Sequence, residues 1–208
     1  MARIDRTARM EALIAHDSAY RHAGMVLAGM DEAGRGPLVG PVVAACVALP
    51  ETSRILWVDD SKKLSEKRRA AVLEEIRRDA LYIGVGQASA EEIDRINILE
   101  ATRLAMRRAA EQVPADIFLI DAVTGLTLRG REIPIIHGDA VSYAIAAASV
   151  VAKVTRDRML EELDREYPQY GFARNKGYGT AEHIAALKAC GPCPLHRRSF
   201  IGHFVGQP

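Results

Sequence analysis

Apolar positions along the chain fall into short runs and longer periodic stretches that follow one another. Short runs rich in β-branched residues predict strands, at residues 25–30, 42–49, 81–87, 116–121 and 133–136. Longer stretches with apolar residues on one side predict helices, at residues 5–20, 65–78, 90–112, 139–166 and 180–189. Because the strands come first and mostly in pairs, and then alternate with helices, we expect an α/β fold with a mixed sheet and a helical C-terminal portion.

Local signals indicate some of the boundaries. Thr180 is a capping residue, and the helix that it begins should end before Gly191-Pro192. Asn97 predicts a break within the third helix. Asp139 follows Gly138, and we expect it to begin the longest helix, whose many alanines allow close packing.

The composition is that of an ordinary globular protein: of 208 residues, 49% are hydrophobic and 26% charged, and the net charge is +1. Wholly disordered, collagen-like and coiled-coil chains are excluded. The charge is unevenly spread, because residues 54–78 hold 8 basic and 5 acidic residues, 171–208 hold 5 and 1, and 79–150 hold 6 and 10. Basic flanks around an acidic middle suit a protein that grips a polyanion and holds cations among carboxylates, although ordinary variation of surface charge would give the same pattern.

Two features indicate where the protein acts. The densest apolar runs fall short of the ~20 residues that a bilayer crossing needs, so we expect no membrane partner. The N-terminus leads into no apolar run with a cleavage site, and three cysteines argue against a disulfide framework. We therefore expect a cytoplasmic protein.

Acidic residues stand where predicted strands end or predicted helices begin, namely Asp31, Glu32, Asp121 and Asp139. Because strand ends meet at one edge of a sheet, these carboxylates can converge although they are distant in sequence. Clustered carboxylates repel one another and need cations to stay ionised, and hard oxygen ligands favour Mg²⁺ or Mn²⁺. Two such ions ~3.5–4 Å apart can activate a water and stabilise the leaving oxygen in phosphodiester cleavage. Each acid alone has a simpler explanation as a helix cap or a turn residue.

The first two acids raise a geometric question. Adjacent residues on a strand face opposite sides, so Asp31 and Glu32 can serve one site only if the strand breaks there or if Glu32 contributes its backbone carbonyl. Residues 33–37, Ala-Gly-Arg-Gly-Pro, supply such a break. Gly34 and Gly36 carry no Cβ, so the backbone of this turn can approach a ligand closely. The turn matches neither a P-loop nor a dinucleotide-binding fingerprint.

A longer stretch around these residues resembles a known family. Residues 30–45, Met-Asp-Glu-Ala-Gly-Arg-Gly-Pro-Leu-Val-Gly-Pro-Val-Val-Ala-Ala, resemble the signature of ribonuclease HII. Further blocks agree with that family in order and spacing, at residues 60–65, 118–121, 138–139, 146–157, 175–180 and 196–200. The resemblance spans roughly residues 25–204.

The resemblance implies a ribonuclease H-like fold and a metal-dependent endoribonuclease. Such an enzyme hydrolyses the RNA strand of RNA–DNA hybrids and nicks duplex DNA 5′ of single embedded ribonucleotides, leaving 3′-hydroxyl and 5′-phosphate ends. By the same resemblance, two Mn²⁺ or Mg²⁺ ions would take part in catalysis, and their ligands would be Asp31, Glu32, Asp121 and Asp139. Gly34, Arg35 and Gly36 would meet the ribose 2′-hydroxyl, and Tyr178 would pack on the next sugar.

Partners and a domain layout follow from the same reading. The partners would be RNA–DNA hybrids and ribonucleotide-containing DNA duplexes, bound by a monomer. We expect residues 1–24 to form a helical extension and residues 25–208 to form the catalytic domain, including the helical C-terminal portion. Basic residues are candidates for phosphate contacts, namely Lys62, Lys63, Lys153, Lys176, Arg197 and Arg198. Lys153 could instead pair with Asp157 along a helix, and Tyr178 could instead be a half-buried core aromatic.

Other patterns suggest alternatives. The sequence Cys190-Gly-Pro-Cys193 matches a thioredoxin-type redox motif. It follows a predicted helix, however, whereas a redox motif of this type precedes one. Zinc held by His183, Cys190, Cys193 and His196 would have suitable ligands without a familiar spacing. On the same fold, the alternatives are ribonuclease HIII, which usually carries an added N-terminal domain, and a non-catalytic nucleic-acid-binding module, which would be expected to lack some of the four acids.

Overall fold

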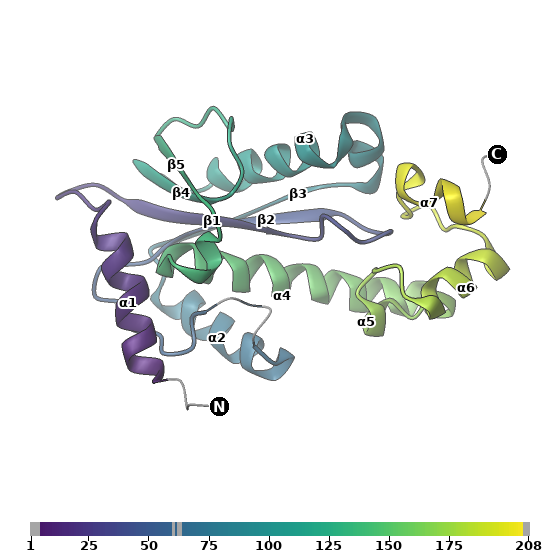
Figure 1. Ribbon diagram of the computed structural model, residues 1–208, viewed down its shortest axis with the longest axis horizontal. Coiled ribbons are helices and arrows are strands. Elements are labelled where there is room, and N and C mark those ends of the chain that lie inside the picture. The colour runs from purple at the N-terminus through teal and green to yellow at the C-terminus, as the bar shows by residue number, and fades with distance from the viewer. Residues whose placement is uncertain (1–4, 60, 62–63, 206–208) are drawn as a thin grey trace.

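The computed structural model describes residues 5–59, 61 and 64–205, in which a mixed sheet lies between two layers of helices (Figure 1). The strand order is β3-β2-β1-β4-β5, with β1 at Leu27–Ala33, β2 at Val42–Ala48, β3 at Tyr82–Ala88, β4 at Ile117–Asp121 and β5 at Arg131–Ile135. β1 pairs antiparallel with β2, and β2 with β3. β1 pairs parallel with β4, and β4 with β5. The sheet is therefore antiparallel on one side of β1 and parallel on the other.

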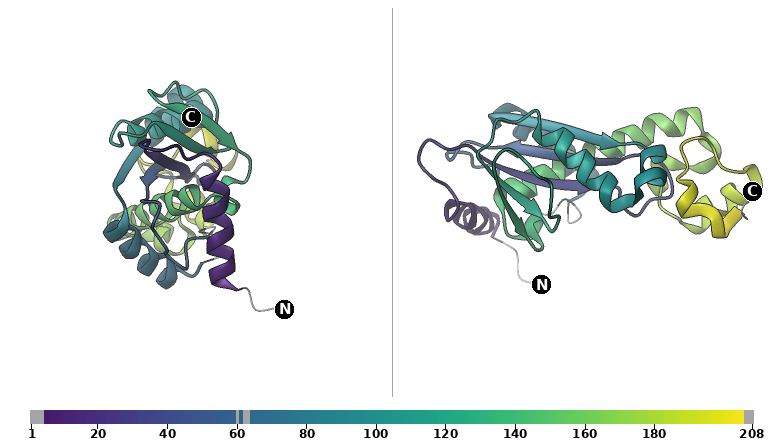
Figure 2. Two further views of the ribbon diagram at one scale, coloured as in Figure 1. Left: turned by 90° about the vertical axis from the view of Figure 1, so that its left-hand side faces the viewer. Right: turned by 90° about the horizontal axis from the view of Figure 1, so that it is seen from above.

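Helices cover both faces of this sheet (Figures 1 and 2). One face carries α3 (Ala90–Ala110), and the other carries α1 (Arg6–Ser18), α2 (Glu66–Asp79) and the long α4 (Tyr143–Glu166). The C-terminal elements gather around the far end of α4; they are η3 (Pro168–Tyr170), α5 (Phe172–Asn175), α6 (Ala181–Cys190) and α7 (Arg198–Val205). The expected α/β fold with a mixed sheet and a helical C-terminal portion is confirmed.

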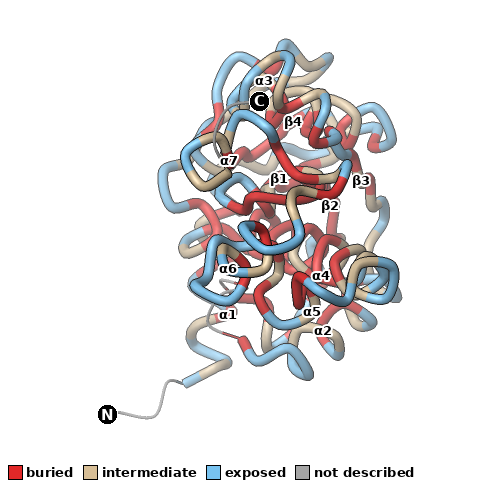
Figure 3. Tube along the Cα trace, turned by 90° about the vertical axis from the view of Figure 1, so that its right-hand side faces the viewer, coloured by how far each residue is buried: buried red, intermediate tan, exposed pale blue. Residues whose placement is uncertain are grey.

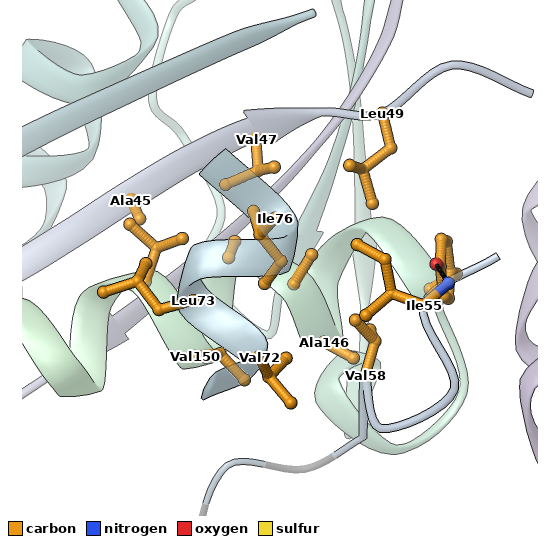
Figure 4. Packing of buried hydrophobic residues seen from close by; sticks show 14 of the residues in the cluster. Ala45, Val47, Leu49, Ile55, Val58, Val72, Leu73, Ile76, Ala146 and Val150 are labelled. Atoms are coloured by element: carbon orange, nitrogen blue, oxygen red, sulfur yellow. Dashed lines mark hydrogen bonds between the residues drawn. The ribbon is translucent and has the colours of Figure 1, made fainter. Parts of the chain in front are cut away.

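The interior strand β2, next to β1 in the sheet, shows why side-chain direction matters near the site. All of its residues are buried, as expected for a strand that helices cover on both faces. Ala45 and Val47 pack in the layer of α2 and α4 (Figure 4), whereas Ala44 and Cys46 pack against α3. A residue on the neighbouring strands therefore faces either the α4 layer or the α3 layer, according to its position along the strand.

The expected start of the longest helix was wrong. α4 begins at Tyr143, and its N-cap is Ser142, whose hydroxyl accepts a hydrogen bond from the backbone N–H of Ile145 at 3.2 Å. Asp139 lies before the helix, in the short 3-10 turn Gly138–Ala140. Serine is as good a cap as aspartate, so Ser142 can begin the helix three residues after Asp139.

The break expected at residues 33–37 is present, but it comes too late along β1 to bring the side chains of both acids to one face. β1 continues past Asp31, because Glu32 and Ala33 still pair with Ala44 and Val43 of β2. The turn begins only after Ala33, at Gly34, where φ is +96°. Asp31 and Glu32 consequently point to opposite faces of an unbroken strand.

Two features of the α3 layer depend on polar side chains. Asn97 adopts a left-handed conformation (φ 67°) inside α3, and its side chain accepts hydrogen bonds from two following backbone N–H groups, which confirms the expected break. The unexpected α7 begins against Asp94 of α3, whose carboxylate accepts from the backbone N–H groups of Arg198 and Ser199 at 2.7 and 2.9 Å. Because this cap comes from a distant helix, the local sequence did not predict α7.

Figure 3 shows the molecule from its C-terminal end, where the outer turns of α6 and α7 are exposed and the strands behind them are buried. Of the helices in the described part of the chain, none combines the length and apolar character that crossing a membrane requires.

Candidate active site

Strand register brings Asp31 and Asp121 together. Met30 of β1 pairs with Ile120 of β4 in the parallel register, so the next residues, Asp31 and Asp121, stand side by side at the ends of this pair. Both face the α4 layer, because Leu27, Ile117 and Leu119, which precede them at even spacing, pack there against Ala144 and Ile145.

Asp139 reaches the same place from the turn before α4. The backbone N–H of Gly138 donates to Asp121 Oδ1 at 2.7 Å, which ties this turn to the end of β4. A Cβ at Gly138 would lie 2.5 Å from Ile145 Cδ1, so the turn packs closely against the first turn of α4. One carboxylate oxygen from each of Asp31, Asp121 and Asp139 lies within 4.8 Å of the other two. We call these three residues the carboxylate cluster.

Glu32 lies close to this cluster without joining it through its carboxylate. Its side chain faces the α3 layer, as alternation along β1 requires, and its Oε1 accepts a hydrogen bond from Arg35 Nη1 at 3.4 Å. The structure thus brings together three of the four expected ligands. The fourth shares the strand with Asp31 but points to the opposite face.

The surroundings of Asp31 are electrostatically unfavourable for an ionised carboxylate. Burial raises the pKa of Asp31 well above its usual range, and the negative charges of Glu32 and Asp121 raise it further. The backbone N–H of Glu32, 2.7 Å from Oδ1, and the Ser149 hydroxyl of α4 oppose this rise. Three hard oxygen donors that repel one another fit a divalent cation such as Mg²⁺ or Mn²⁺, which removes the repulsion.

Ser149 is a site residue that the sequence analysis missed. It is buried in α4, and its hydroxyl lies 2.7 Å from that of Ser61. Ser61 belongs to the segment after β2, so this contact brings that segment against α4 behind Asp31. Both serines lie in blocks that resemble the family, residues 146–157 and 60–65, and that resemblance was the signal that could have found them.

A second part of the site is the glycine loop, residues 34–41, which follows β1. Arg197 is fully buried beneath it and donates four hydrogen bonds of 2.6–3.0 Å. They go to the backbone carbonyls of Gly34, Arg35, Pro37 and Gly40. Arg197 therefore holds the loop from inside, and the expectation that it contacts phosphate is not met by its position.

Arg156 of α4 completes this support. It is also buried and donates to the carbonyls of Pro41 (3.1 Å), Val39 (3.1 Å) and Lys176 (2.9 Å). Burial lowers the pKa of Arg197 to about 9 and that of Arg156 to about 10. A Cβ at Gly34 would lie 2.0 Å from Arg156 Nε, so only glycine lets the loop sit on this guanidinium.

Because carbonyls of the glycine loop point inward, some of its backbone N–H groups must point outward. In a trans peptide the C=O and the following N–H point in opposite directions. Since the carbonyls of Gly34 and Arg35 point to Arg197, the N–H groups of Arg35 and Gly36 point away from the interior. The loop thus presents backbone donors on its outer side.

Tyr178 stands beside this loop. Its side chain is 47% exposed, so it is not a core aromatic, and its ring edge lies 3.7 Å from where a Gly36 Cβ would be. The Leu38 N–H donates to the Gly177 carbonyl at 2.8 Å, which joins the segment before Tyr178 to the glycine loop. The carbonyl of Tyr178 is 2.9 Å from Nδ1 of buried His183.

The other residues expected to contact phosphate differ in their surroundings. Lys153 forms an ion pair with Asp157 at 2.7 Å along α4, which was the alternative considered for this residue. Lys176 pairs with Glu161 at 2.8 Å. Arg198 is exposed at the start of α7. Lys62 and Lys63 lie outside the described residues.

The cysteine motif does not form a second site. Cys190 is exposed at the end of α6 and Cys193 is buried, and both are free thiols. Burial raises the pKa of the Cys193 thiol, the opposite of what a redox nucleophile needs. His183 and His196 face each other through Nε2 atoms 3.1 Å apart. Within the described residues, the carboxylate cluster is the one group of side chains with a metal-ligand arrangement.

Comparisons with known proteins agree with this site. The family model described as Ribonuclease HII matches residues 28–203. A ribonuclease HII of Ruminiclostridium cellulolyticum is 53% identical over 181 residues, which are 86% of this chain and 71% of the relative. The crystal structure of ribonuclease H2 from Pyrococcus horikoshii matches with a TM-score of 0.73 and 25% identity, covering 88% of this chain and 100% of that one. The ribonuclease HII of Archaeoglobus fulgidus, in a complex with PCNA, gives 0.75 and 28%, covering 88% and 97%.

The match extends over both strands of the carboxylate cluster, the glycine loop, Arg156, Tyr178 and Arg197. It favours ribonuclease HII over ribonuclease HIII and an enzyme over a binding module. The chain belongs to the ribonuclease HII family, and it is therefore a nuclease of the ribonuclease H type, a hydrolase that acts on RNA–DNA hybrids with the metal dependence typical of that family.

Proposed function

We propose that this enzyme nicks duplex DNA on the 5′ side of single embedded ribonucleotides, in addition to cutting the RNA strand of hybrids, and that it leaves 3′-hydroxyl and 5′-phosphate ends. The observation that carries the proposal is the carboxylate cluster, whose ligand oxygens lie within 4.8 Å of one another. The glycine loop begins three residues after Asp31, so the outward donors of the loop and the cluster belong to one site.

The proposed ligands of two Mn²⁺ or Mg²⁺ ions are Asp31, Asp121, Asp139 and Glu32. Because the Glu32 carboxylate faces the α3 layer, we expect its backbone carbonyl to make the contact. When bound, the ions supply an activated water and stabilise the leaving oxygen of the phosphodiester. Bound cations would favour the ionised form of Asp31, and Ser149 orients Asp31 by its hydrogen bond.

The glycine loop is proposed to recognise the ribose. The 2′-hydroxyl is the group that distinguishes RNA from DNA at one nucleotide, and backbone donors that would stay unpaired without it discriminate sharply. The N–H groups of Arg35 and Gly36 are suited to this task because Arg197 holds their peptide groups in a fixed direction. Tyr178, beside Gly36, is proposed to pack on the sugar of the following nucleotide and to favour a deoxyribose there.

Phosphate contacts of the flanking duplex are proposed for the exposed Arg198 and for Lys62, Lys63, Lys153 and Lys176. In this proposal Arg197 acts only through the glycine loop. We further propose a monomeric, cytoplasmic enzyme in which residues 1–24 extend the domain of residues 25–208. Three cysteines that remain free thiols support the reducing compartment.

A labelled DNA duplex with one ribonucleotide tests the proposal, incubated with Mg²⁺, Mn²⁺ or EDTA beside the Asp31→Asn variant. We expect a single metal-dependent nick 5′ of the ribonucleotide, absent in the variant, which should still bind the duplex. Cleavage confined to longer hybrid tracts would contradict the embedded-ribonucleotide activity. Substantial Mg²⁺-dependent turnover by Asp31→Asn would contradict the assignment of the site.

A further inference from the structure

Helix α1 lies outside residues 28–203, the part of the chain that the family model matches. It packs beside the start of α4 (Figure 1), with Met10 and Leu13 buried in the same apolar cluster as Ala146 and Val150. Beside this apolar contact, two polar side chains of α1, those of Arg9 and Asp17, form hydrogen bonds with the backbone. Both meet the segment that carries Asp139.

Asp17 binds the first turn of α4. Its side chain is buried, and Oδ2 accepts a hydrogen bond from the backbone N–H of Ala144 at 2.8 Å. A further hydrogen bond joins it to the Ser142 side chain, which itself accepts from the backbone N–H of Ile145. The first N–H groups of a helix have no partner within it, so Asp17 and Ser142 together fix where α4 starts.

Arg9 binds the turn immediately before α4. Its Nη2 donates to the carbonyl of Ala140 at 2.7 Å and to Asp59 Oδ1 at 3.0 Å. Arg6, one turn earlier on α1, pairs with the other oxygen of Asp59 at 3.1 Å. Ala140 is the residue after Asp139, so α1 holds the backbone on the far side of this ligand.

The turn that carries Asp139 is therefore fixed at both ends. On one side Gly138 N–H donates to Asp121, and on the other Arg9 and Asp17 hold Ala140 and Ala144. This matters because the three carboxylates repel one another, and a loosened turn would let Asp139 move away. Asp31 and Asp121 cannot relax in this way, since paired strands carry them.

We propose that α1 is a positioning element of the metal site, in which Arg9 and Asp17 keep Asp139 within reach of the cation that Asp31 and Asp121 also bind. The inference rests on the proposed function, because it assigns α1 a role in that same site. Groups that orient metal ligands from outside typically change metal affinity ~10–100-fold when they are removed. Neither Arg9 nor Asp17 touches substrate or metal in this role.

The test is calorimetric titration of the full chain with MnCl₂, without nucleic acid. We expect Arg9→Ala and Asp17→Ala to weaken Mn²⁺ binding about tenfold. Asp17→Asn should bind nearly as well as the wild type, because its amide oxygen can still accept from Ala144. On a hybrid substrate, saturating Mn²⁺ should restore kcat in the Arg9→Ala and Asp17→Ala variants, so that the loss appears in the metal requirement alone.

Two controls separate positioning from general loosening. Glu11→Gln changes another charge of α1, which pairs with Arg54 at 3.1 Å away from the turn, and should leave Mn²⁺ binding unchanged. Val72→Ala creates a cavity in the core between α2 and α4 and should lower stability without changing Mn²⁺ affinity. If Asp17→Ala does not fold, Arg9→Ala decides, since the Arg9 side chain is 29% exposed.

Two outcomes contradict the inference. Wild-type Mn²⁺ affinity in Arg9→Ala, or an equal loss in Val72→Ala, would overturn it while leaving the metal site intact. Absence of Mn²⁺ binding in the wild type, with no change in Asp31→Asn, would overturn the metal site and the inference with it.

Discussion

The carboxylate cluster and the glycine loop lie side by side but are held in place by different means. Asp31 and Asp121 stand on two strands whose hydrogen bonds are shared among many residues. The glycine loop has an isolated β-bridge, Val39–His196, in place of such a ladder. Seven hydrogen bonds from two buried arginines hold its carbonyls and that of Lys176. The strand pair that carries Asp31 and Asp121 should therefore tolerate the loss of single side chains other than the ligands, whereas the loop depends on one or two residues beneath it.

The largest effect is expected when a proposed metal ligand is removed from the carboxylate cluster. Asp121→Asn should reduce kcat on RNA–DNA hybrids by about a thousandfold or more, because cation binding is worth several kcal/mol in the transition state. Its unfolding temperature in EDTA should not fall, since an isosteric amide relieves repulsion within the cluster. Single-turnover cleavage and thermal unfolding measure the two effects. A variant that keeps a tenth of wild-type activity would show that Asp121 is not a ligand.

The corresponding change in the glycine loop is removal of Arg197, the buried arginine that binds its carbonyls. Arg197→Met should lower the free energy of unfolding by about 3–5 kcal/mol, since it leaves buried carbonyls unpaired. It should also reduce the preference for a ribonucleotide-containing duplex over an all-DNA duplex, measured by binding in Ca²⁺. The matched control is Arg103→Met, a half-buried arginine that donates to the Thr124 carbonyl away from the site. Equal losses of preference in both variants would contradict the role of Arg197.

A smaller effect is expected at Tyr178. Tyr178→Ala should slow nicking at single ribonucleotides about tenfold, the loss of one partly exposed aromatic contact of about 1–2 kcal/mol. Cleavage within continuous hybrids should change less, and Tyr178→Phe should restore the wild-type ratio because it keeps the ring. The ratio of the two cleavage rates is the measurement. An equal loss on both substrates would show that the residue does not read the junction.

The smallest effect concerns the pH dependence of stability. Because the pKa of Asp31 is raised in the folded state above its ordinary value of 3.8, the folded protein retains a proton that the unfolded chain releases. In EDTA, the free energy of unfolding should therefore fall as pH rises from about 4 through the folded pKa. Asp31→Asn lacks this contribution and should be more stable than the wild type at pH 8. Urea unfolding at pH 5 and pH 8 tests this, and parallel changes in both proteins would contradict it.

The sequence by itself determined the elements that depend on local pattern. Apolar runs placed the five strands and the long helices, and Asn97 marked the kink in α3. Acids at predicted strand ends and helix starts, Asp31 and Asp121 among them, indicated a carboxylate site, and the stretch around Gly34 indicated the family. These signals are short-range, because strand alternation, caps and glycine turns depend on neighbouring residues.

Only the tertiary structure decided the features that depend on distant contacts. It placed Glu32 on the opposite face of β1 from Asp31, and it moved Asp139 into a turn held by Asp121. It buried Arg197, which in sequence is indistinguishable from the exposed Arg198 next to it. A charged side chain goes inside only where several carbonyls converge to satisfy it, and the carbonyls that do so lie about 160 residues earlier in the chain. No local pattern carries that information, because the partners become neighbours only when the chain folds.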